Sequence, residues 1–109
     1  NWPIETASNN SYLPGPGLRK LLAIRQPLCA RDACGRPAQT CETDHIVEYD
    51  PRRPADRQTV LANLQPLSKN CHQLKTQGGW RYQRDPATGQ TTVTTALGFQ
   101  HTTPASRLE

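Results

Sequence analysis

Methionine is absent from this sequence, and phenylalanine occurs once and tryptophan twice among its 109 residues. Only 34% of the residues are hydrophobic, and no apolar run approaches the roughly 20 residues that a membrane-spanning helix needs. The sequence therefore predicts no membrane segment, and because no signal-peptide pattern is visible we expect a cytoplasmic protein. Because the natural start is missing, we interpret the chain as a domain cut from a longer protein, from which a leader could have been removed.

The small supply of apolar residues predicts a thin core. Domains that bury little apolar surface commonly need disulfides or a bound metal to stay folded. The four cysteines could supply either, and a cytosolic location favours thiolate–metal chemistry. The 13 Lys and Arg against 9 Asp and Glu give a net charge of +4. This charge is compatible with a polyanionic partner but does not identify one.

The chain divides into a linker, one domain and a tail. Residues 1–17 are polar, end in Leu-Pro-Gly-Pro-Gly and predict a flexible linker. Residues 18–104 have the size of a single domain. Residues 105–109 form a tail whose final Leu-Glu resembles a remnant of an expression vector.

The domain shows both helical and strand patterns. Leucines at helical spacing predict a short helix over residues 18–25. Loose alternation around Ile46 and Val47 predicts a strand over residues 40–48. The remaining expected elements are a return strand at 60–62, a helix with Pro66 in its first turn that Gly78 and Gly79 end, and a hairpin within 80–103.

The cysteines predict a structural zinc site. Cys29 and Cys34 are separated by four residues, a weaker signal than the two-residue spacing of the tightest zinc knuckles. Cys71 could close the site from the predicted helix. Cys41 and Ser68 are candidates for the fourth ligand, and Cys41 is favoured because serine binds zinc poorly. A disulfide or buried free thiols are the alternative interpretations.

A second group of residues predicts a hydrolytic metal site. Asp44 and His45 are neighbours on the expected strand, so their side chains point to opposite faces. If the helix packs across the strand pair, Asp44 and His72 could hold one divalent cation while His45 faces a water. Mg²⁺ or Mn²⁺ would suit this site, although Ni²⁺ or Zn²⁺ would also accept the imidazole. His101 lies in a Thr-rich segment, and we assign it no role.

These motifs together resemble the HNH endonucleases over about residues 18–104. The resemblance implies an α+β fold of the small ββα-metal type, with a zinc-knuckle-like cysteine cluster, an N-terminal helix and a C-terminal β-hairpin. The chain departs from the family pattern in the Cys29–Cys34 spacing, in Ser68, which stands where a cysteine is expected, and in the arginine-rich loop at 50–59. The matching residues are Cys29, Cys34, Cys41-Glu-Thr-Asp44-His45-Ile46, Asn63-Leu64 and Leu67-x3-Cys71-His72-x2-Lys75-Thr76.

The resemblance implies a metal-dependent endonuclease that hydrolyses DNA phosphodiester bonds and leaves a 5′ phosphate. By position, His45 matches the general base, and Asp44 and His72 match the ligands of the catalytic cation. Asn63 matches the middle residue of the motif, which pins a loop and so orients the base. The sequence equally allows Asn63 to be an ordinary turn residue.

The expected partner is DNA, bound with weak sequence preference because no base-reading motif is visible, and a homodimer on DNA is compatible with the motif. Two alternatives stay open, a non-catalytic zinc-stabilised nucleic-acid-binding module and a secreted disulfide domain. The candidates for contacts with the DNA backbone are Arg52, Arg53, Arg57, Lys69 and Lys75.

Overall fold

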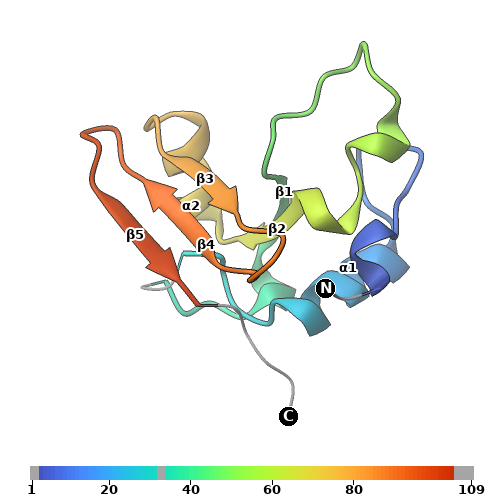
Figure 1. The fold of residues 1–109 in the computed structure, drawn as a ribbon, viewed down its shortest axis with the longest axis horizontal. Coiled ribbons are helices and arrows are strands. Elements are labelled where there is room, and N and C mark those ends of the chain that lie inside the picture. The colour runs from blue at the N-terminus through green and yellow to red at the C-terminus, as the bar shows by residue number, and fades with distance from the viewer. Residues whose placement is uncertain (1–2, 32–33, 105–109) are drawn as a thin grey trace.

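The computed structural model describes residues 3–31 and 34–104. It has the expected α+β class, with two α-helices, a two-stranded sheet and a three-stranded sheet in these residues (Figure 1). The elements are α1 (Pro16–Arg25), β1 (Glu42–His45), β2 (Leu64–Leu67), α2 (Lys69–Thr76), β3 (Arg81–Arg84), β4 (Thr91–Thr94) and β5 (Gln100–Thr103). One-turn 3₁₀ helices lie at Pro3–Thr6, Ala38–Thr40, Ala55–Arg57 and Leu61–Asn63.

The centre of the fold is an antiparallel ribbon of β1 and β2, followed directly by α2. The register places Asp44 opposite Gln65 and His45 opposite Leu64. Helix α2 contacts both strands of the ribbon. This is the ββα unit that the resemblance implies, so that expectation is confirmed.

The return strand and the start of the second helix differ from the sequence prediction. The strand expected at 60–62 is wrong, because Leu61–Asn63 forms a 3₁₀ helix and β2 begins at Leu64. Pro66 lies inside β2, where its carbonyl accepts a hydrogen bond from the N–H of Ala30 at 2.8 Å. Helix α2 starts later because Ser68 is its N-cap, with the side chain accepting the Cys71 N–H at 3.3 Å.

The segment expected to be a linker packs on the domain in the residues that the structure describes. Ser8 forms a β-bridge with Val60. The Glu5 carboxylate lies 2.7 Å from an Arg25 guanidinium nitrogen and 3.0 Å from one of Arg84. The N-terminal helix α1 begins at Pro16, two residues before the expected start. These contacts tie the N-terminal segment to α1 and to β3.

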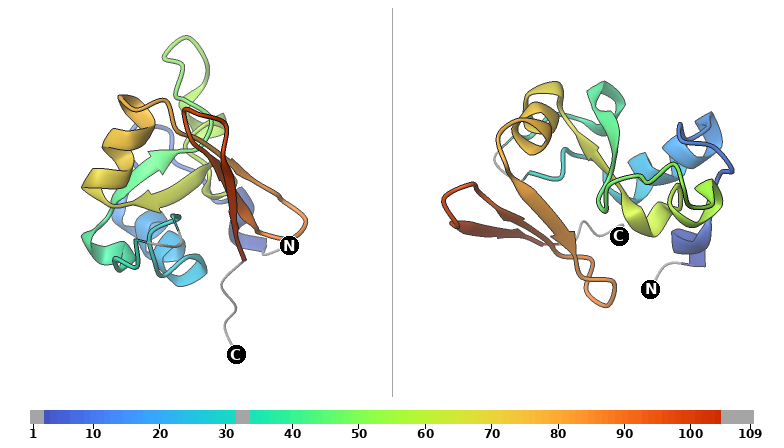
Figure 2. Two further views of the ribbon diagram at one scale, coloured as in Figure 1. Left: turned by 90° about the vertical axis from the view of Figure 1, so that its left-hand side faces the viewer. Right: turned by 90° about the horizontal axis from the view of Figure 1, so that it is seen from above.

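The C-terminal region contains the expected hairpin and one further strand. β3 and β4 form the hairpin, and β5 pairs antiparallel with β4. The sequence prediction missed β5, whose Gln100–Thr103 segment is polar and mostly exposed. In the view from above in Figure 2, this sheet and the N-terminal helices lie at opposite ends, with the ribbon and α2 between them.

Two small cores hold these parts together. One contains leucines of α1 with residues around the start of β2: Leu18, Leu22, Leu61 and Leu64. The other joins the ribbon and α2 to the three-stranded sheet, and cysteines are part of it: Cys29, Ala30, Leu67, Cys71, Tyr82 and Val93. Burial of thiols where a larger protein would bury aliphatic side chains fits the expectation of a thin core. No helix of the described residues is long and apolar enough to cross a membrane.

Candidate active site

The alternation of β1 sets two carboxylates toward α2. Glu42 and Asp44 are two residues apart, so they share one face of the strand. His72, on α2, lies between them: its Nδ1 is 2.6 Å from Glu42 Oε1 and its Nε2 is 3.3 Å from Asp44 Oδ1. The structure therefore brings together Asp44 and His72, the pair that the sequence singled out as cation ligands.

The Asp44 carboxylate is held by hydrogen bonds at one of its two oxygens. The residue is only 6% exposed, and a buried carboxylate needs such partners. Its Oδ2 accepts hydrogen bonds from Lys75 Nζ at 2.7 Å and Gln65 Nε2 at 2.9 Å. Its Oδ1 is left facing His72.

Lys75 has a different role from the one expected. Its Nζ donates to Asp44 Oδ2 at 2.7 Å, to the His45 carbonyl at 2.6 Å and to the Ile46 carbonyl at 3.2 Å. An ammonium group has three N–H bonds, so these contacts use all of them. The sequence suggested Lys75 as a contact for DNA phosphate, whereas in the structure its ammonium group binds Asp44 and the end of β1.

The hydrogen bond between His72 and Glu42 leaves an electron pair directed at Asp44. A short contact from a carboxylate to Nδ1 places the proton of a neutral imidazole on Nδ1. The Nε2 lone pair then faces Asp44 Oδ1 at 3.3 Å, and two such acceptors need a proton or a metal ion between them. A carboxylate on the far nitrogen is also the usual support of a metal-bound histidine. This donor set fits a divalent cation.

Glu42 was not predicted from the sequence. The signal that could have found it is the period of two along a strand, which puts residue 42 on the face of Asp44.

His45 lies on the opposite face of β1 and is 6% exposed. Its ring stacks against Tyr12, with centroids 5.2 Å apart and planes at 21°, and it also contacts the Tyr49 ring at 5.3 Å. Its Nε2 is 2.9 Å from Thr59 Oγ1. Burial lowers the pKa of His45, although the Asp44 charge acts in the opposite direction. A lowered pKa keeps the imidazole neutral, which is the form that accepts a proton.

Asn63 pins the chain just after β1. Its Oδ1 accepts the Val47 N–H at 2.8 Å, and its Nδ2 donates to the Val47 carbonyl at 3.2 Å and to the Gln58 carbonyl at 3.1 Å. These contacts fix the position of the loop that follows His45.

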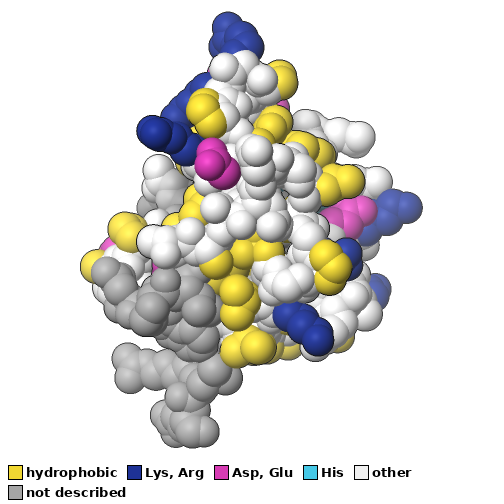
Figure 3. All heavy atoms as spheres, turned by 90° about the vertical axis from the view of Figure 1, so that its right-hand side faces the viewer, with side chains coloured by type: hydrophobic (Ala, Val, Ile, Leu, Met, Phe, Trp, Pro, Cys, Tyr) yellow, Lys and Arg dark blue, Asp and Glu magenta, His cyan; other side chains and the backbone are white. Residues whose placement is uncertain are grey.

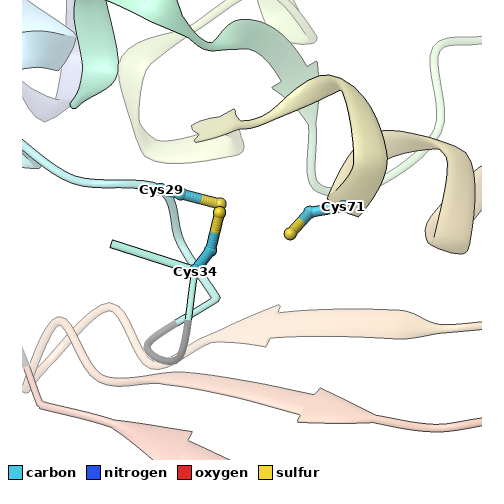
Figure 4. A group of neighbouring side chains, drawn as sticks. All are labelled: Cys29, Cys34 and Cys71. Atoms are coloured by element: carbon cyan, nitrogen blue, oxygen red, sulfur yellow. The ribbon is translucent and has the colours of Figure 1, made fainter. Parts of the chain in front are cut away.

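Three of the four cysteines converge on one point. The Sγ atoms of Cys29, Cys34 and Cys71 all lie within 4.8 Å of one another, and Figure 4 shows them pointing toward a common space. Cys41, the favoured fourth ligand, lies outside this group, and its Sγ is 3.9 Å from the Arg36 carbonyl. The Ser68 hydroxyl is instead 3.3 Å from Cys34 Sγ. The described residues thus support three ligands from the predicted set and place Ser68 beside them.

The thiols have unequal acidities. Burial raises the pKa of Cys29 to about 12. Burial also acts against the Cys34 thiolate, but hydrogen bonds from Ser68, the Arg36 backbone and the neighbouring thiols lower its pKa to about 7. A zinc ion binds thiolates and would stabilise the charged form of all three sulfurs. The cluster therefore has the chemistry of a zinc site.

Comparison with known families agrees with this geometry. Residues 29–78 match the sequence profile described as HNH endonuclease, and this range contains the cysteine cluster, the ribbon and α2. Residues 29–78 belong to the HNH family. HNH domains have nuclease-type or nucleic-acid-related functions, and this is the broad functional class that the match gives for residues 29–78.

A similar sequence occurs in a longer protein. The chain is 33% identical over 108 residues to "Uncharacterized protein Rv3776" of Mycobacterium tuberculosis (strain ATCC 25618 / H37Rv). The alignment covers 97% of this chain and 20% of that protein, so the chain spans about a fifth of its relative. No solved structure matches the chain.

The HNH domain also carries exposed basic side chains. The loop between β1 and β2 projects from the ribbon in Figure 1, and Figure 3 shows Lys and Arg side chains at the upper end of the face where this loop lies. Arg52, in this loop, pairs with Asp50 at 3.1 Å but keeps 88% of its side chain exposed. The other exposed candidates for phosphate contacts are Arg53, Arg57 and Lys69.

Proposed function

We propose that this HNH domain is a metal-dependent DNA endonuclease. In this proposal His45 is the general base, and Asp44 and His72 hold the catalytic cation. The observation that carries the proposal is the 3.3 Å approach of two electron-pair donors, Asp44 Oδ1 and His72 Nε2. The other polar atoms of both groups are occupied by protein partners, so these two donors are left for a cation.

The protein residues around the cation would fix its ligands in advance. Lys75 and Gln65 hold one oxygen of Asp44, and Glu42 holds the outer nitrogen of His72. When bound, Mg²⁺ or Mn²⁺, or alternatively Ni²⁺ or Zn²⁺, would polarise the phosphate and stabilise charge on the departing oxygen. Preorganised ligands of this kind need little rearrangement during the reaction.

His45 would accept the proton of the attacking water. The water oxygen bonds to phosphorus, the water proton passes to the neutral imidazole, and the bond from phosphorus to the 3′ oxygen breaks. The product then carries a 5′ phosphate. Asn63 supports this step indirectly by fixing the loop that follows the base.

The basic loop supports DNA as the substrate. Exposed arginine side chains bind phosphates and confer salt-dependent affinity, but they read little sequence. We therefore expect weak sequence preference. The residues proposed to contact the DNA backbone are Arg52, Arg53, Arg57 and Lys69.

We also propose that Cys29, Cys34 and Cys71 hold a structural zinc ion. Structural zinc sites are closed by four ligands. The fourth donor would come from Ser68, whose hydroxyl lies beside Cys34, or from Cys41 after a small shift of the chain.

Cleavage of supercoiled plasmid in Mg²⁺ or Mn²⁺, with and without EDTA, tests the proposed function. We expect the parent chain to cut and His45→Ala to lose on the order of 10²–10⁴-fold in rate. His101→Ala is the matched control, because His101 lies on β5 and is exposed. Equal cleavage by His45→Ala and the parent would reject His45 as the base. DNA binding without any cleavage by the parent would assign the domain to the non-catalytic, zinc-stabilised class.

A further inference from the structure

Thr59 connects the proposed base to the N-terminal segment. It lies between β1 and β2 and is fully buried, with 0% of its surface exposed. Its Oγ1 is 2.9 Å from His45 Nε2 and 3.3 Å from the backbone carbonyl oxygen of Tyr12. One hydroxyl therefore contacts both an imidazole nitrogen, which can donate or accept, and a carbonyl, which can only accept.

The Thr59 hydroxyl has one proton to donate, and the direction of that proton sets the tautomer of the His45 imidazole. A hydroxyl donates one hydrogen bond and accepts up to two. Because the Tyr12 carbonyl can only accept, the Thr59 proton points to it, and Oγ1 must accept from His45. The proton of the neutral imidazole is then on Nε2, and Nδ1 carries the lone pair.

The reverse arrangement would break one of the two contacts of this hydroxyl. If the buried Thr59 donated to Nε2, the Tyr12 carbonyl would lose its hydrogen bond from Thr59 Oγ1. Within residues 3–31 and 34–104, Nδ1 of His45 makes no hydrogen bond. The nitrogen left for a water is thus the one with the electron pair.

We propose that Thr59 and the Tyr12 carbonyl fix the tautomer of His45, so that Nδ1 is the nitrogen that accepts the proton of the attacking water. Thr59 is a positioning residue, since it acts through the imidazole. This inference rests on the proposed function only in assigning the base its task. The tautomer itself is a property of the folded chain.

The N-terminal segment holds this arrangement at several points. Asn9 N–H donates to the Thr59 carbonyl at 2.8 Å, and Ser8 bridges Val60. The Tyr12 ring stacks on His45, so the same residue contacts the imidazole with its ring and Thr59 with its carbonyl. Residues 8–12 lie outside the range 29–78 that matches the HNH family. In this chain the base is therefore oriented partly by residues outside the family motif.

Nitrogen NMR of the imidazole tests the tautomer without using activity. Long-range ¹⁵N–¹H correlations of the histidine-labelled chain, at about pH 8 where free imidazole is neutral, distinguish a protonated Nε2 from a protonated Nδ1. We expect His45 to show a pyrrole-type Nε2 and a pyridine-type Nδ1. A protonated Nδ1 in the parent overturns the proposal, whatever the variants do.

Two substitutions separate the hydroxyl from the shape of the side chain. Thr59→Val keeps the shape and removes the hydroxyl, and we expect a mixture of tautomers and a kcat at least about tenfold lower. That loss is smaller than the 10²–10⁴-fold expected for removal of the base. Thr59→Ser keeps the hydroxyl and should restore both the tautomer and kcat. KM for DNA should change by less than about twofold in both variants, because Thr59 is buried and does not touch substrate.

Thr102→Val, on exposed β5, controls for the exchange of threonine for valine. Thr59→Val with the parent's tautomer and kcat would overturn the proposal. A loss of kcat that Thr59→Ser does not restore, with the parent's tautomer unchanged, would also overturn it, because the role would then be structural. If the tautomer shifts as expected but the parent cuts no DNA, the hydrogen-bond relay is upheld and the proposed nuclease function fails.

Discussion

At the scale of single residues, the proposed cation site depends on which atoms of Asp44 and His72 already have hydrogen-bond partners. Lys75 and Gln65 occupy Oδ2 of Asp44, and Glu42 occupies Nδ1 of His72. Each group therefore presents one defined atom, Oδ1 and Nε2. Three residues therefore hold the cation ligands that the family motif implies, and the sequence did not predict this role for them: Lys75, Gln65 and Glu42.

Glu42 gives a direct test of this support. Glu42→Gln keeps the size but weakens the acceptor at Nδ1, so His72 is held less firmly and becomes a poorer ligand. We expect Mn²⁺ affinity, measured by calorimetry, to fall about 10- to 100-fold. This is the usual effect of removing a carboxylate that hydrogen-bonds to a metal-binding histidine. Glu48→Gln, on the exposed loop after β1, is the matched control. Equal Mn²⁺ affinity in Glu42→Gln and the parent would show that Glu42 does not support a metal ligand.

The same scale shows what a sequence can and cannot predict about a site. The grouping of Asp44, His45 and His72 was predictable, because the motif keeps fixed spacings within two strands and a helix. The contacts that the Lys75 and Tyr12 side chains make were not predictable. Lys75 has the pattern of a solvated helix lysine, and its burial depends on how close α2 packs to β1. Tyr12 reaches His45 across more than thirty residues of chain, and no local pattern encodes such a contact.

At the scale of elements, the short strands were the hardest to place. Val60, Leu61 and Ala62 form an apolar run that fits either a strand or a buried turn, since periodicity cannot distinguish the two over three residues. Pro66 fits both the first turn of a helix and a strand edge. Ser68 decides the boundary, because its side chain caps α2. The ribbon and helix were predicted as elements, but their limits depended on that cap.

Ser68 also allows the zinc ligands to be tested. Its hydroxyl is 3.3 Å from Cys34 Sγ, so Ser68→Cys would place a fourth sulfur beside the cluster. We expect zinc affinity, measured by competition with a chromophoric chelator, to rise at least about tenfold, because thiolate is a better zinc ligand than hydroxyl. Cys41→Ser should change zinc affinity much less than Cys34→Ser does. A larger loss in Cys41→Ser than in Cys34→Ser would make Cys41 a ligand and reverse this assignment.

At the scale of the whole molecule, the N-terminal segment connects α1 to β3. Oε1 of Glu5 binds both Arg25 of α1 and Arg84 of β3. Arg25 is only 5% exposed, and its guanidinium also donates hydrogen bonds to the Leu61 and Leu64 carbonyls. Burial lowers the pKa of Arg25 to about 10, which leaves the guanidinium charged at neutral pH. The Glu5 carboxylate balances this buried charge.

Removing Glu5 should therefore destabilise the domain. Glu5→Ala leaves a buried guanidinium without its carboxylate, which typically costs about 3–5 kcal/mol. We expect a clear fall in the free energy of unfolding, measured by urea denaturation. Glu48→Ala, which removes an exposed carboxylate, should stay within about 0.5 kcal/mol of the parent. If the two variants unfolded at the same urea concentration, the Glu5 contacts would not stabilise the fold.

Zinc removal is the corresponding test for the second core. Cys29 and Cys71 are buried beside Tyr82 and Val93, where the ribbon and α2 meet the three-stranded sheet. A core this small contributes little by itself, so a structural metal would supply folding free energy directly. We expect elemental analysis of the purified chain to find about one zinc ion per chain. A strong chelator should lower the melting temperature by more than about 10 °C, because a loss of 1 kcal/mol of stability lowers the melting temperature of a domain of this size by roughly 4–8 °C. Zn²⁺ should restore the melting temperature and Mg²⁺ should not, because thiolates bind Mg²⁺ poorly. A zinc-free chain that melts at the same temperature with and without chelator would show that the three thiols support the core as ordinary buried side chains.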